Sequence, residues 1–270
     1  MPKIDIEYFY MLGIPINLED RNLGIIYQPT LRDFINNGVD IVSFTHPFLL
    51  DKDMVLNRNQ GVDEYLNNLG RLQFLIVYDE CTKEKRLETG ERGILEYLVD
   101  SLKLIYKTND IQIIPSISSI IVDKKFIITN ENFDYLSKLI IEMTRINVKE
   151  MKKKIEEERK KELEDKEEED PYLKKFRELE RQYNKEKEGE KKDFSLLDMI
   201  NIVIHSQSVI DYDRVFNLTV YQLKNSYEVL INKETFNINL MHRISPNFQP
   251  SEDFKLWEEK ANVIKSELNC

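Results

Sequence analysis

A run of charged residues near the middle of the chain most constrains the fold. From 149 to 193, 33 of the 45 residues are charged, with 16 basic and 17 acidic side chains intermixed. Before Pro171 its apolar residues are Met151, Ile155 and Leu163, which are too few to bury a core. Many Glu and Lys lie close enough for i,i+4 pairing, which favours a solvated helix interrupted near Pro171, or a flexible linker. The chain therefore divides into two folded parts and a charged connector.

The part before the connector, residues 1–148, is predicted to be a mixed α+β domain. Asp123 and Lys124 sit between two β-branched runs, which indicates a tight hairpin even though the turn lacks the usual glycine. The period of the apolar residues predicts further short strands and several amphipathic helices. The expected strands are 14–17, 23–27, 111–114, 119–122 and 125–128, and the expected helices are 30–38, 63–75, 93–106 and one from 130 onward.

Capping residues mark the ends of several helices. Thr30 is placed to cap the first helix with Asp33 in its first turn, and Gly38 is placed to end it. Asn130 is expected to cap the helix that follows the hairpin. The stretch 73–78 could equally end a helix or form a strand.

Residues 194–270 are predicted to form an all-helical domain. Thr219 and Gln222 form the capping-box pattern T-x-x-Q, and Pro246 with Pro250 forces a turn before the last helix. The expected helices are 196–205, one from 219 to about 242, and one from Ser251 that carries Phe254, Trp257, Ala261 and Ile264. The predicted fold class is therefore α+β at the N-terminus, a charged helical connector, and all-α at the C-terminus.

Two aromatic features are candidate partner-binding sites. The later half of the connector carries an apolar stripe at +4, +3, +4 spacing, which places its members on one helix face. The stripe consists of Tyr172, Phe176, Leu179 and Tyr183. It could dock in a partner's groove or fold back onto the chain's own C-terminal helices, and both interpretations stay open. Trp257 is of a type favoured in interfaces, although its place on an apolar helix face favours a core residue.

Charge and targeting signals exclude several classes of protein. The net charge of −10 argues against general nucleic-acid binding, because phosphates require a basic face. The start of the chain carries Lys3, Asp5 and Glu7, so we expect no signal peptide, and no apolar run is long enough for a membrane span. Cys81 and Cys270 are far apart in sequence, which fits a reducing compartment. A cytoplasmic location follows.

The sequence carries no recognised catalytic motif. Its eight glycines form neither a P-loop nor a dinucleotide fingerprint, and its three histidines, His46, His205 and His242, form no H-x-x-x-H pair. His46 is expected in a loop before Pro47, and the other two near helix ends. We therefore expect no cofactor and no enzymatic activity.

Three other side chains could take part in chemistry, and each has a simpler interpretation. Asp211 and Asp213 could hold a metal with a third carboxylate, but a solvated turn before a helix is the better interpretation. Cys81 has Glu80 and Glu84 as sequence neighbours, which makes it an unpromising nucleophile.

The C-terminal part resembles a family of phage proteins. The segments that carry the resemblance are Leu197-Asp198-Met199-Ile200-Asn201, the break at Ser206–Ser208, Leu218-Thr219-Val220-Tyr221-Gln222-Leu223, and, near the N-terminus, Ile26-Tyr27-Gln28-Pro29-Thr30-Leu31-Arg32-Asp33-Phe34. Together with the charged middle and the late tryptophan, they are similar to tail-module proteins of phages of Gram-positive bacteria, some of which are tail assembly chaperones.

The resemblance implies transient binding to the tape-measure protein or to tail-tube subunits, in the cytoplasm of a bacterial host. It implies no catalytic residues and leaves self-association open, and the charge and the apolar pattern already argue against nucleic-acid and membrane partners. Two alternatives remain. One is a permanent structural component of the phage tail or baseplate. The other is a nuclease or other metal-dependent enzyme, which would need three converging carboxylates in a deep pocket.

Overall fold

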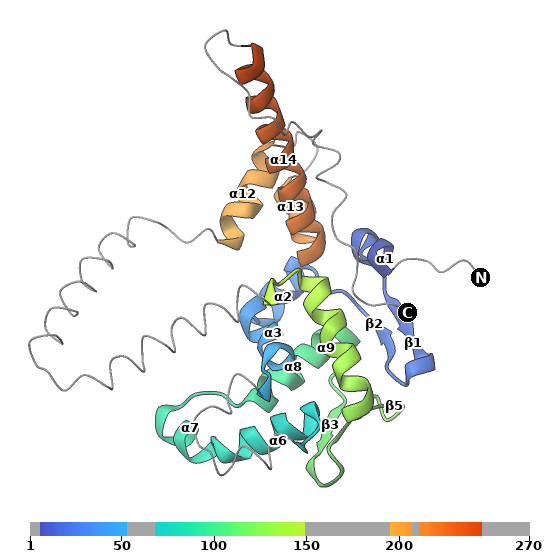
Figure 1. The fold of residues 1–270 in the computed structure, drawn as a ribbon. Helices are drawn as coiled ribbons and strands as arrows, with labels where there is room; N and C mark the ends of the chain where they lie inside the picture. The colour runs from blue at the N-terminus through green and yellow to red at the C-terminus, as the bar shows by residue number, and fades with distance from the viewer. Residues whose placement is uncertain (1–5, 53–67, 149–194, 207–210, 245–270) are drawn as a thin grey trace, which may run out of the picture. The chain divides into compact units, whose positions relative to one another are not determined.

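The computed structural model of the chain describes residues 6–52, 68–148, 195–206 and 211–244. Contacts group residues 1–146 and 200–270 into one compact unit and residues 147–199 into a second. The connector lies outside the described residues, so the predicted division at 148 and 194 stays a prediction. Within the first unit the elements are mostly helices with two small sheets (Figure 1), which confirms the predicted fold class.

Two small antiparallel sheets form near the predicted positions. β1 (Ile16–Leu18) pairs with β2 (Gly24–Ile26), and the 3-10 turn η1 (Glu19–Arg21) joins them. β3 (Ile111–Ile114), β4 (Ser119–Val122) and β5 (Phe126–Ile128) form the second sheet, in that order, with η3 (Pro115–Ile117) after β3. Asp123 and Lys124 both adopt positive φ, at 50° and 54°, so the tight turn forms without glycine.

Helices surround the core of the N-terminal part. α3 (Ile41–Leu49) packs against α8 (Ile94–Tyr106) and α9 (Asn130–Thr144). Large side chains fill the space between these helices and α6, and the buried aromatic residues among them are Phe44, Phe48, Phe74 and Phe133. The remaining N-terminal helices are α1 (Ile6–Leu12), α2 (Leu31–Asn37), α6 (Arg71–Cys81) and α7 (Lys83–Thr89).

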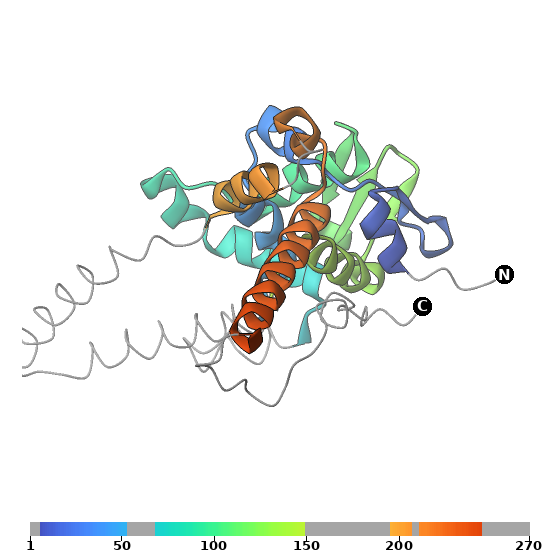
Figure 2. The ribbon, with the colours of Figure 1, turned by 90° about the horizontal axis from the view of Figure 1, so that it is seen from above.

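The C-terminal helices are α12 (Leu196–Ser206), α13 (Tyr212–Phe216) and α14 (Val220–Ile244), and the last two pack onto the N-terminal part. The Leu31 N–H donates to the Leu218 carbonyl at 2.9 Å, and α13 contacts α2. α14 contacts both α1 and α9, and Figures 1 and 2 show α9 beside its first turns.

Two predicted helix caps are confirmed. The Thr30 side chain accepts the Asp33 N–H at 3.2 Å, and the Asp33 carboxylate accepts the Thr30 N–H at 2.8 Å. At the start of α14, Thr219 and Gln222 bond in the same reciprocal way, at 3.2 and 2.9 Å. Both pairs satisfy N–H groups that a helix start leaves unpaired.

The structure decides one open prediction and contradicts another. Residues 73–78 are part of α6 and form no strand, because Phe74 and Leu75 pack into the core from a helix. His46 lies inside α3 and not in a loop. Asp40 caps α3, and burial of Phe44 and Phe48 one turn apart outweighs the backbone hydrogen bond lost at Pro47.

The predicted cap at Asn130 was also wrong, and the reason is informative. Thr129 is the residue that precedes α9, and its N–H donates to the Asn132 side chain at 2.8 Å. The Asn130 side chain instead accepts the Gln73 N–H at 3.0 Å, which lies in the first turn of α6. Gly70, at the N-cap of α6, has no side chain to do this, and a Cβ there would lie 2.4 Å from Asn130 Cγ. One helix therefore caps another.

We expect Asn130→Ala to lower the free energy of unfolding by about 1 kcal/mol, because the Gln73 N–H loses its acceptor. Gly70→Ala should act in the same direction, since its Cβ would displace the Asn130 side chain. Urea unfolding followed by circular dichroism measures the change. Asn37→Ala is the matched control, because Asn37 is exposed and bonds within its own helix. Equal stability of the Asn130 and Asn37 variants would contradict the cap.

Candidate functional site

The partner-binding residues predicted from the sequence lie outside the described residues. They are Tyr172, Phe176, Leu179, Tyr183 and Trp257. Their roles therefore stay predictions, and the described residues have to be searched for a binding surface of their own.

The helix α1 is apolar on both of its faces. Ile6 and Tyr10 are buried, while its outward side chains and Ile14 are between 41% and 65% exposed. Three of the exposed residues have i, i+3, i+4 spacing, so they share one face. This set, called the α1 surface, consists of Tyr8, Met11, Leu12 and Ile14. A helix that is apolar all round is normally covered on both sides, which makes the α1 surface a candidate docking site.

Two glutamines from other parts of the chain hold the end of α1 in place. The buried Gln28 donates through Nε2 to the Phe9 carbonyl at 2.6 Å and to the Ile14 carbonyl at 2.9 Å. Gln222, on α14, donates to the Met11 carbonyl at 3.0 Å. Because these bonds satisfy backbone groups at the end of the helix, the α1 surface is preorganised.

A pair of tyrosines joins α1 to α14. The rings of Tyr10 and Tyr221 lie 5.4 Å apart, and both residues are almost fully buried. The Tyr221 hydroxyl donates to the Glu7 carboxylate at 3.1 Å, and the Tyr10 hydroxyl donates to Glu142 at 3.3 Å. Burial, with the nearby carboxylates, raises the pKa of both phenols, and that of Tyr221 reaches about 12.

A second polar contact joins α14 to the end of α9. Lys224 donates through Nζ to the carbonyls of Thr144 at 2.8 Å and Arg145 at 3.3 Å, and burial lowers the pKa of its amine. The Arg145 guanidinium pairs with Glu228 at 2.7 Å and lies over the Tyr221 ring. Cations at the last carbonyls of a helix are stabilising, so this cluster fixes the end of α9 against α14.

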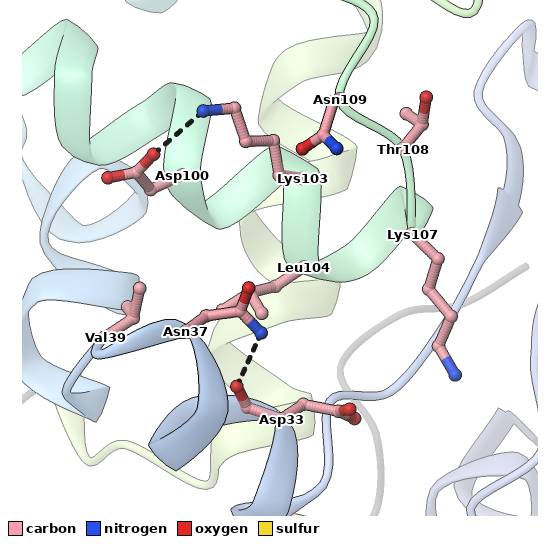
Figure 3. Close-up of a pocket in the computed structure, with 9 residues that line it drawn as sticks. All are labelled: Asp33, Asn37, Val39, Asp100, Lys103, Leu104, Lys107, Thr108 and Asn109. Carbon is pink, nitrogen blue, oxygen red and sulfur yellow. Dashed lines mark hydrogen bonds and ion pairs between the residues drawn. The ribbon is translucent and has the colours of Figure 1, made fainter.

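A polar pocket of about 440 Å³ opens between α2 and the end of α8 (Figure 3). It is lined by Asp33, Asn37, Val39, Asp100, Lys103, Leu104, Lys107, Thr108 and Asn109. Lys103 pairs with Asp100 at 3.2 Å, and the Lys107 ammonium lies 4.9 Å from the centre of the Tyr27 ring. With two acidic and two basic side chains in its lining, the pocket has no net charge that would select a charged substrate.

The carboxylates singled out from the sequence have structural partners. Asp211 accepts the Arg214 N–H at 2.9 Å and so caps α13, and Asp213 pairs with Arg32 at 2.8 Å. Asp211 fits the turn before a helix that was the favoured interpretation, whereas Asp213 lies in the first turn of α13. Among the described residues, no group of three or more His, Cys, Asp or Glu side chains could hold a metal ion. Cys81 is exposed at the end of α6.

Comparison with family models adds the decisive observation on origin. Residues 185–262, which include α12, α13 and α14, match the model of the YomV second domain, from a phage-associated protein family. The match points to a phage-derived protein. No curated protein and no solved structure matches the chain. None of the described helices is long and apolar enough to cross a membrane.

The α1 surface was not predicted from the sequence. The residues from Ile6 to Leu12 are apolar at nearly every position, so they show no helical period. One feature of the sequence could have indicated this surface. Aromatic and apolar residues are dense here, with Tyr8, Phe9 and Tyr10 in succession, in a stretch too short to span a membrane. Which of these side chains stay exposed depends on the contact with α14, which lies more than 200 residues away in sequence.

We expect the protein to lose stability as the pH rises from 10 to 12. An unfolded tyrosine titrates near 10.0, whereas folding raises the pKa of Tyr221 to about 12. The stability that this shift contributes is fully present below pH 10 and is lost as unfolded chains release their protons. Tyr221→Phe should therefore reduce the slope of the free energy of unfolding against pH in this range.

Urea unfolding at a series of pH values measures that slope. Tyr8→Phe is the matched control, because its side chain is 61% exposed. Identical slopes for the Tyr221 and Tyr8 variants would show that ionisation of Tyr221 does not change the free energy of unfolding.

Proposed function

We propose that this protein is a phage tail assembly chaperone that binds tape-measure or tail-tube proteins during assembly. The observation that carries the proposal is the match of residues 185–262 to a phage-associated domain. The resemblance of residues 197–201 and 218–223 to tail-module proteins gives the narrower role. These residues lie in α12 and at the start of α14, inside the matched range.

The α1 surface supplies the contact that such a role requires. A tape-measure helix exposes apolar side chains before the tube encloses it, and exposed apolar patches aggregate. Tyr8, Met11 and Leu12 offer an apolar helix face that another amphipathic helix can pack against. Methionine adapts to irregular partners, and the net charge of −10 favours solubility of the complex.

A permanent place in the tail or baseplate is the rival function. It needs the same kind of apolar surface, so the described geometry does not separate the two. They differ in whether the protein is present in finished particles. A transient chaperone leaves before the particle is complete, whereas a structural component stays at a fixed copy number.

We expect the tagged protein, isolated from its host during particle production, to bring down a tape-measure or tail-tube protein and to be missing from purified particles. Mass spectrometry of both samples measures this. Leu12→Asp should reduce the recovery of the tail protein about tenfold or more, because a buried carboxylate in the contact costs over ~1.4 kcal/mol.

Leu87→Asp is the matched control, since Leu87 is 78% exposed on α7, away from the α1 surface. It should recover as much tail protein as the unchanged chain. If the protein is found in particles at a fixed copy number, it is a structural component and not a chaperone. Equal recovery of the tail protein by the two variants would mean that the α1 surface does not bind it.

A further inference from the structure

The apolar face of α14 continues past the turns that the rest of the protein covers. Six apolar residues fall within an arc of ~80° when the helix is unrolled at about 100° per residue. They are Val220, Leu223, Tyr227, Ile231, Ile238 and Met241. The first two are buried, and Ile231, Ile238 and Met241 are 40%, 49% and 65% exposed. Figure 1 shows the last turns of α14 extending away from α1, α2 and α9.

This face is therefore core at one end and open at the other, with the exposed Glu234 between Ile231 and Ile238. Ile231, Ile238 and Met241, called the α14 stripe, span about 15 Å along the helix axis. Such a stripe on a long helix is the pattern of a face that packs against a second helix. Leu240, which is 42% exposed, lies on a different side of α14, well outside the arc.

The chain's own C-terminal residues have the length and pattern to cover the α14 stripe. Six residues, 245–250, separate Ile244 from Ser251, which is within the usual length of a connection between antiparallel helices. They include two prolines, at 246 and 250, a residue type that interrupts helices and favours turns. Residues 251–264 then carry apolar side chains at helical spacing, and as a helix they would span about 20 Å.

Residues 251–264 are long enough to cover the α14 stripe but too short to reach the α1 surface. A helix that starts six residues after Ile244 and runs back for about 20 Å ends beside residue 231. The α1 contact at Gln222 lies about 33 Å from Ile244 along the axis, beyond that reach. The family comparison independently places α14 and Trp257 in one domain, because its match extends to residue 262.

We propose that residues 251–264 fold back antiparallel on α14 in the same chain. Phe254 and Trp257 then cover Met241 and Ile238, and Ile264 covers Ile231. α14 and this segment would form a helical hairpin within the domain that the family model matches. This inference does not rest on the proposed function, because it concerns how the free chain covers its own surface.

Trp257 is the one tryptophan of the chain, so its fluorescence reports directly on this contact. In the full-length protein we expect blue-shifted emission and weak quenching by iodide. Ile238→Asp should shift the emission to the red and strengthen quenching, because the charge opens the contact. Met241→Asp should do the same, and Leu240→Asp, two residues from Ile238 but outside the arc, should leave both signals unchanged. Unchanged far-ultraviolet circular dichroism confirms that each variant is folded.

Three results would overturn the proposal. Solvent-exposed emission in the unchanged chain would mean that the α14 stripe is open to a partner. Equal red shifts for Ile238→Asp and Leu240→Asp would mean that Trp257 is buried elsewhere. Emission that moves to the red on dilution, together with a dimer in analytical ultracentrifugation, would mean that a second copy supplies the cover. A monomer with dilution-independent, blue-shifted emission supports the contact within one chain.

Discussion

The contact between the first turns of α14 and the helices α1 and α9 is the interaction on which the described structure depends. It brings together residues that are far apart in the sequence: the tilted rings of Tyr10 and Tyr221 lie 5.4 Å apart, and Lys224 caps α9. Arg145 is nearly buried within it and pairs with Glu228. Because a buried charge that loses its partner is costly, each member of this cluster constrains the others. The orientation of α1, and with it the exposure of the α1 surface, follows from that constraint.

Local signals were predictable from the sequence, and long-range ones were not. The pairs Thr30–Asp33 and Thr219–Gln222 satisfy neighbouring backbone groups, so three-residue spacing was enough to identify them. The Asn130 side chain caps a helix that starts near Gly70, and no local pattern contains that partner. Pro47 suggested a loop around His46, but the helix persists because its core face is well packed.

The candidate site also has features that are local in sequence and features that depend on long-range contacts. The sequence predictions of binding residues rested on helical period, which is strong in residues 172–183 and around Trp257, and both stretches lie outside the described residues. α1 escaped prediction because an all-apolar helix has no period to detect. Its outward face becomes a candidate only once Gln28 and Gln222 are seen to fix the helix with Tyr10 inward. The period of the apolar residues and the capping residues were, in contrast, sufficient for the fold class.

The two ends of the charged connector are attached to the same compact unit, since residues up to 146 and from 200 onward belong to it. The described residues on the two sides of the connector therefore belong to one compact unit, although about fifty residues separate them in the sequence. Their shared interface runs from Leu31–Leu218 to Arg145–Glu228, and every contact in it joins a residue before the connector to a residue after it. A chain cut within the connector would keep both halves of that interface.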